Sequence, residues 1–159
     1  MQTLDLLRWL HIIGAAVLLG TGAGIAFFMV MAHRTRNPAI IAHVAETVVV
    51  ADALFTATAV VLQPITGILL ARRIGWPLSQ GWLLVSIALY SVTGLFWLPV
   101  VWIQLRLRDL ARTSVATGEP LGKNYDALFR AWFLCGWPAF LAVLAIIWLM
   151  IARPFIRLF

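Results

Sequence analysis

The sequence is poor in charge and in cysteine. Only 11% of its 159 residues are charged and 63% are hydrophobic, against about 25% and about 45–50% in ordinary soluble domains. A domain of this size could not bury so much apolar surface in water, so the composition excludes a soluble globular protein. The single cysteine, Cys135, lies in an apolar stretch without a CxxC or Cys/His partner. This excludes an internal disulfide and indicates a small buried hydrophobic residue, not a redox centre.

The excess of basic residues does not indicate nucleic-acid binding. The formal net charge is +6, but the twelve Lys and Arg residues gather at the edges of the apolar segments, where they anchor to lipid headgroups. The sequence lacks a basic patch with interleaved aromatic residues, of the kind that a strand-binding groove needs. It also lacks a Ser/His/Asp set at one depth and a phosphate-cradling glycine loop. We therefore expect a lipid bilayer as the main partner, no nucleic acid and no hydrolase site.

Four apolar segments are long enough to cross a bilayer core, which takes about 20 apolar residues in helical form. These segments cover residues 9–32, 47–71, 82–105 and 130–152. Membrane-spanning strands would be shorter and would alternate apolar with polar residues, which these segments do not. No repeat or low-complexity tract divides the chain. The sequence therefore predicts one all-α transmembrane domain over residues 1–159, an antiparallel four-helix bundle.

The second and third helices are predicted to extend beyond the bilayer. Asn37 followed by Pro38 is a helix-start signal, so the second helix begins near Pro38, well before its apolar span. The third helix continues past the membrane through RLRDLARTSVA. Asn124 is interpreted as the cap of the fourth helix.

Basic residues are distributed unevenly between the two ends of the bundle. Loops one and three hold seven of them, namely Arg34, Arg36, Arg106, Arg108, Arg112, Lys123 and Arg130. The termini and loop two hold five, namely Arg8, Arg72, Arg73, Arg153 and Arg157. Because basic loops stay in the cytoplasm, this bias predicts that loops one and three are cytoplasmic and that both termini lie outside.

Polar residues inside the spans follow one face of the second helix and one face of the third. The first stripe contains Asp52, Thr56, Gln63, Thr66 and Gly67, and the second contains Ser86, Tyr90, Thr93, Gly94 and Gln104. We expect the two stripes to face each other across the bundle interior. Hydroxyl and amide groups of this kind often do no more than form a hydrogen bond to a neighbouring helix, and each such bond stabilises the bundle by about 0.6 kcal/mol. The Asp52 carboxylate is harder to accommodate in lipid. Near the helix amino end it is either solvated or stabilised by the helix dipole, and the alternative is a proton relay.

The first helix has two faces built from small residues. At about 100° per residue, one face carries His11, Gly14, Ala15, Leu18, Gly22 and Ile25, and the opposite face carries Ala16, Gly20 and Gly24. The row of small residues suits close packing, so we expect a homodimer through it. The other face suits a planar ligand with an imidazole at its edge, as in a helix that provides an axial ligand to haem iron. The alternative is an interfacial histidine bonded to a headgroup, to water or to a helix-end carbonyl.

Short motifs along the whole chain resemble known membrane families. The chain resembles the HemJ-type protoporphyrinogen oxidases, which are small four-helix inner-membrane proteins. The motifs that carry this resemblance are LHIIG at 10–14, FMVMAH at 28–33, TGILLAR at 66–72 followed by a Gly-Trp pair at 81–82, and WLMIARPF at 148–155. The chain also resembles a bacterial family of small predicted integral membrane proteins of unknown function. The motifs typical of that family are VVLQPITG at 60–67, GWPL at 75–78 and WLPVVW at 97–102. The leucine-histidine pair also resembles the membrane helices of copper-resistance D proteins.

The HemJ resemblance implies a b-type haem on the first-helix histidine, His11. It also implies a lysine in the third helix at the position of Ser86, and a hydroxyl cannot replace an ammonium group in steering an acidic porphyrin. The resemblance therefore implies haem binding without the oxidase's basic group, and it leaves enzymatic activity open.

Spacing and resemblance together predict an inner-membrane protein that binds haem b or a related tetrapyrrole through His11, with a redox or electron-transfer role and an unidentified redox partner. The expected cofactor-binding residues are His11, Gly14, Leu18, Gly22, Ser86 and Tyr90. A second axial ligand comes from Met150 or a partner subunit, or the iron is five-coordinate. The alternative is a cofactor-free accessory or assembly subunit, or a small transporter lined by the two polar stripes.

Overall fold

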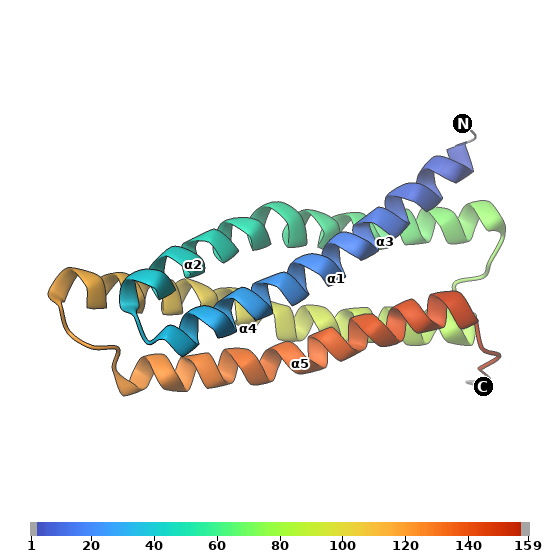
Figure 1. Ribbon diagram of the computed structural model, residues 1–159. Helices are drawn as coiled ribbons and strands as arrows, with labels where there is room; N and C mark the ends of the chain where they lie inside the picture. Colours follow the sequence, from blue (N-terminus) through green and yellow to red (C-terminus); the bar gives the residue numbers. More distant parts are fainter. Residues whose placement is uncertain (1–2, 157–159) are drawn as a thin grey trace.

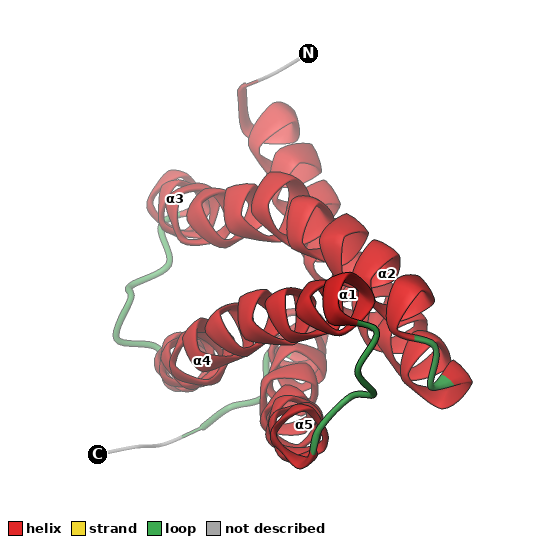
Figure 2. Cartoon of the chain, turned by 90° about the vertical axis from the view of Figure 1, so that its left-hand side faces the viewer, coloured by secondary structure: helices red, strands yellow, loops and turns green. Residues whose placement is uncertain are grey.

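The computed structural model describes residues 3–156, and helices and short loops account for all of them (Figures 1 and 2). Helix α1 covers Thr3–Thr35, and α2 (Pro38–Ala51), η1 (Asp52–Thr56) and α3 (Ala57–Ile74) form one continuous second helix. Helices α4 (Gly81–Thr117) and α5 (Lys123–Ala152) complete the chain. The described chain ends lie at the same end of an antiparallel four-helix bundle, as predicted (Figure 1).

All four helices are long and apolar enough to cross a membrane. The second and third contain 37 residues each, which corresponds to about 55 Å at 1.5 Å per residue. A bilayer core is only about 30 Å thick. The prediction that these two helices extend beyond the bilayer is therefore confirmed.

Capping residues explain where the helices begin and end. The side chain of Asn37 accepts hydrogen bonds from the backbone N–H groups of Ala39 and Ile40, with Pro38 in the first turn, so the predicted cap is confirmed. The prediction for the fourth helix is wrong: Gly122 is its N-cap, and Asn124 lies inside the first turn. Gly75 ends α3 at φ 84°, a left-handed conformation that glycine adopts without a steric cost.

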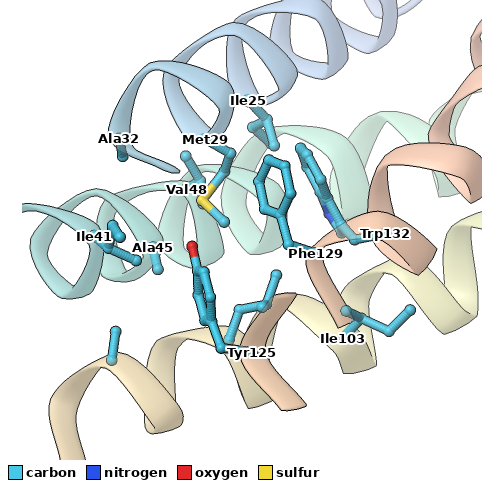
Figure 3. Packing of buried hydrophobic residues seen from close by; sticks show 12 residues of the cluster. Ile25, Met29, Ala32, Ile41, Ala45, Val48, Ile103, Tyr125, Phe129 and Trp132 are labelled. Carbon is cyan, nitrogen blue, oxygen red and sulfur yellow. The ribbon is translucent and has the colours of Figure 1, made fainter. Parts of the chain in front are cut away.

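The buried side chains form two clusters at different depths. The larger cluster lies toward the end that holds loops one and three, and it includes Met29, Ile41, Ala45, Tyr125 and Phe129 (Figure 3). The smaller cluster lies toward the termini and is made of Ala71, Trp82, Leu83 and Leu149. The candidate site lies between the two clusters.

Candidate functional site

A half-open cavity of about 340 Å³ lies between the helices of the bundle, and all four spanning helices line it. Its residues come from the middle of α1, from η1 and the start of α3, and from the middle parts of α4 and α5. Ligand pockets commonly measure about 300–1,000 Å³. The cavity is therefore large enough for a small organic molecule.

Asp52 lies on the wall of this cavity with only 5% of its surface exposed. It begins η1, a five-residue π-helical turn in which the Ala57 backbone N–H donates to the Asp52 carbonyl. Such turns interrupt α-helices at functional sites more often than elsewhere. Trp97 of α4 donates an Nε1–H bond of 3.3 Å to Asp52 Oδ1. The carboxyl group therefore faces the bundle interior and not the solvent at a helix end.

Three buried polar atoms around the cavity have no hydrogen-bond partner among the described residues. They are Thr56 Oγ1, Gln104 Oε1 and Trp132 Nε1, and all three residues line the cavity. Their residues are at most 6% exposed. Buried polar groups in native structures are nearly always bonded to protein, water or ligand. These three atoms are themselves closed off from the cavity space, so they are buried polar atoms beside the cavity and not an open part of its wall.

Aromatic side chains form much of the remaining wall. Trp97, Trp132, Phe133, Trp137 and Phe140 all line the cavity. Among the described residues that line the cavity, Asp52 is the only one with an ionisable side chain. Sequence reasoning identified Asp52 and Gln104 as polar positions but missed these aromatics, because apolar residues inside a span carry no sign of which face they occupy.

His11 is held by the second helix and does not line this cavity or the smaller one beside it. Its Nδ1 lies 2.8 Å from Thr66 Oγ1. If the single hydroxyl proton of Thr66 goes to the Leu62 carbonyl at 2.8 Å, then Oγ1 accepts from the His11 Nδ1–H. This assignment leaves His11 Nε2 without a proton.

The predicted cofactor-binding residues are not gathered around one space. The upper part of the His11 face packs against α3: Gly14 is buried against Gln63, and Gly67 lies against the His11 ring. Lower on the same face, Leu18 and Gly22 line the central cavity.

The remaining predicted residues have other partners. Ser86 donates to the Trp82 carbonyl of its own helix, and Tyr90 donates to the Val60 carbonyl. Met150 packs beside the smaller buried cluster. Leu18 and Tyr90 share a cavity of about 70 Å³, well below the size of common ligand pockets.

The two polar stripes face each other only in part. Asp52 of the first meets α4 through Trp97, while Gln63 and Thr66 turn to α1 and bond His11. On the opposite face of α1, nothing lies within 4 Å of a Cβ built on Gly20 or Gly24. Dimerisation through that face stays a prediction.

The fold defines a multi-pass integral membrane protein, with a mainly apolar cavity between its helices and one carboxyl group in the cavity wall. Residues 5–154 match the family described as predicted integral membrane protein (DUF2269), and the chain belongs to this family. This confirms the expected resemblance to a membrane-protein family of unknown function, whereas the likeness to HemJ-type and copper-resistance D proteins stays a prediction. The search of curated proteins and the search of solved structures find no match.

Proposed function

We propose that the central cavity is the substrate site of a small transporter, and that it binds a small, largely apolar molecule next to Asp52. The buried carboxyl group carries this proposal. Ionisable residues inside membranes are costly, and where they occur they mark substrate or ion pathways. Asp52 is 5% exposed, lines the cavity and begins a π-helical turn.

The place of the cavity along the bundle supports a transport role. It lies between two packed clusters of buried residues, within the apolar spans of all four helices. Substrate sites of membrane carriers lie within the bilayer, where a helix departs from regular α geometry. The π-helical turn at Asp52 is such a departure.

A cavity-filling variant tests the proposal. The probes are benzyltrimethylammonium and its uncharged carbon isostere, neopentylbenzene, and binding is followed by tryptophan fluorescence because three cavity residues are tryptophans. A Cβ on Gly136 meets nothing within 4 Å, so Gly136→Leu fills the cavity without a clash at that atom. We expect saturable binding of at least one probe by the wild type and by the control Ala131→Leu, an exposed position of the same helix, but not by Gly136→Leu. Equal binding by all three proteins would refute the proposal.

Haem binding through His11 is the second candidate, and one observation favours it. Histidines that ligate metals usually donate their other ring N–H to a fixed acceptor, and Thr66 is that acceptor for Nδ1 of His11. The space inside one chain fits less well, since Gln63 covers Gly14 and His11 lines neither cavity. A haem at this position would therefore lie at the outer surface of the bundle, with Nε2 as the iron ligand and a second copy as the source of further contacts.

Absorption spectroscopy tests this candidate. Protein purified from haem-replete cells is expected to show a Soret band that His11→Ala abolishes and that His43→Ala, at an exposed position of α2, preserves. A colourless wild-type preparation would refute haem binding. A band that persists in His11→Ala would refute the assignment of His11 alone.

The charge bias of the loops supports a location in the bacterial inner membrane with periplasmic termini. In this orientation, loops one and three, with the larger buried cluster beside them, would lie toward the cytoplasm.

A further inference from the structure

The charges around the central cavity are unbalanced. Asp52 is the only ionisable residue among the lining residues, and its polar neighbours, the indole N–H of Trp97 and the hydroxyl of Thr56, are uncharged. The four ion pairs of the described residues join other groups: Arg8–Asp5, Arg36–Asp126, Arg108–Asp109 and Arg112–Glu46. No cationic side chain of the described chain therefore neutralises Asp52.

An isolated carboxylate is costly in apolar surroundings, so it is stable there only when it carries a proton or pairs with a cation. These two states exclude each other at one carboxyl group. A ligand with a positive charge would thus compete with a proton for Asp52, whereas an anion would be repelled and would find no basic side chain among the lining residues.

The aromatic residues that line the cavity together with Asp52 suit an organic cation. Indole and benzene rings attract cations through their faces, most strongly when water is excluded. Trp97, Trp132, Trp137, Phe133 and Phe140 supply five such rings, and the cavity volume of about 340 Å³ leaves room for apolar substituents.

A bare metal ion suits the cavity poorly. Calcium takes six to eight oxygen ligands, and transition metals prefer clusters of His, Cys, Asp or Glu. The lining residues carry one carboxyl group, the hydroxyls of Thr56 and Thr93 and the amide oxygen of Gln104. Among the described residues no group of three or more His, Cys, Asp or Glu could hold a metal ion.

We infer that the cavity binds a lipophilic organic cation, such as a quaternary or protonated amine, in exchange for the proton of Asp52. The cation pairs with the carboxylate and packs against the aromatic rings, and one proton leaves Asp52 for each cation bound. This inference rests on the proposed function, because it names the substrate class of the same cavity. With access from both sides of the membrane, the same exchange couples cation movement to proton movement in the opposite direction.

The test compares benzyltrimethylammonium with neopentylbenzene, which has the same shape and no charge. In the wild type we expect the cation to bind at least tenfold more tightly than the neutral isostere. Its Kd should rise by up to tenfold for each unit of acidification in the range where Asp52 is protonated, since proton and cation compete for one group. Addition of the cation to weakly buffered protein should release one proton per bound cation, a measurement that needs no variant.

Variants of Asp52 locate the effect. Asp52→Asn should weaken cation binding at least tenfold and abolish both its pH dependence and the proton release, while binding of neopentylbenzene stays within about twofold. Asp52→Glu should restore the pH dependence. If Asp52→Asn does not fold, the inference is tested by proton release on cation binding. The wild type should release one proton per bound cation, and Gly136→Leu should release none.

The failures of the two proposals are distinguishable. Equal affinity for the two probes, without proton release, would overturn the cation inference and leave the cavity as a site for neutral molecules. Absence of saturable binding for both probes would overturn the cavity as a substrate site as well.

Discussion

The hydroxyl of Tyr90 donates a hydrogen bond to the backbone carbonyl of Val60, on the neighbouring spanning helix. That carbonyl is the one that Pro64 leaves without its usual donor, because proline has no N–H to return to the residue four positions earlier. In lipid, no water replaces the missing bond, so a side chain of another helix must supply it. A proline is therefore tolerated inside α3 with a partner that lies 30 residues away in sequence.

Removing this hydroxyl should destabilise the bundle. Tyr90→Phe leaves the Val60 carbonyl without a donor, and we expect a loss of about 1–2 kcal/mol in the free energy of unfolding. The measurement is unfolding of the detergent-solubilised protein by SDS. In a Pro64→Ala background the new backbone N–H bonds Val60, so Tyr90→Phe should then cost much less. An equal cost in both backgrounds would contradict the explanation.

Added volume at Gly14 should disturb the packing of α1 on α3. A Cβ at this position meets the amide group of Gln63, whereas a Cβ on Gly20 of the same helix meets nothing within 4 Å. We expect Gly14→Ala to lower the free energy of unfolding by about 1–3 kcal/mol, the usual cost of overpacking. Gly20→Ala serves as the matched control and should leave the monomer no less stable than the wild type, so similar losses in both variants would rule out the Gln63 contact as the cause.

The two asparagines near helix starts should respond differently to alanine. The Asn37 side chain accepts bonds from two backbone N–H groups, so Asn37→Ala should cost about 1 kcal/mol of stability. Asn124 lies inside the first turn of α5, after the cap Gly122, and alanine is the better helix former there. Asn124→Ala should therefore be neutral or slightly stabilising in the same SDS titration, and a loss as large as that of Asn37→Ala would contradict this cap assignment.

The proposed orientation predicts which loops an impermeant reagent reaches. In a Cys135→Ala background, a cysteine at Ser79 between α3 and α4 should be labelled in intact cells. A cysteine at Glu119, between α4 and α5, should be labelled only after the membrane is opened. The reverse pattern would place loops one and three outside the cytoplasm.

Much of the fold follows from local features of the sequence. Apolar length predicts four spanning helices, and the Asn37–Pro38 pair predicts where the second begins, because both depend on residues close together in the chain. The π-helical turn at Asp52 was not predictable in this way. It adds one residue to a helical turn without a proline or glycine inside DALFT to mark it.

The composition of the candidate site could not be predicted from the sequence, because it depends on contacts between helices. Helical periodicity places His11, Gly14, Leu18 and Gly22 on one face, and it predicts a single surface for a flat ligand. The structure divides that face, with His11 and Gly14 against α3 and with Leu18 and Gly22 on the cavity wall. Periodicity describes one helix at a time, so it cannot state which neighbour covers which part of a face.

The sequence by itself determined that this chain is a four-helix membrane protein of the DUF2269 family, since a lipid solvent requires long apolar helices and their motifs are local. Only the tertiary structure decided what the polar residues do. It paired His11 with Thr66, which lies 55 residues away, and Asp52 with Trp97, which lies 45 residues away. Those partners depend on the rotation and tilt of whole helices, which packing sets and no short motif encodes.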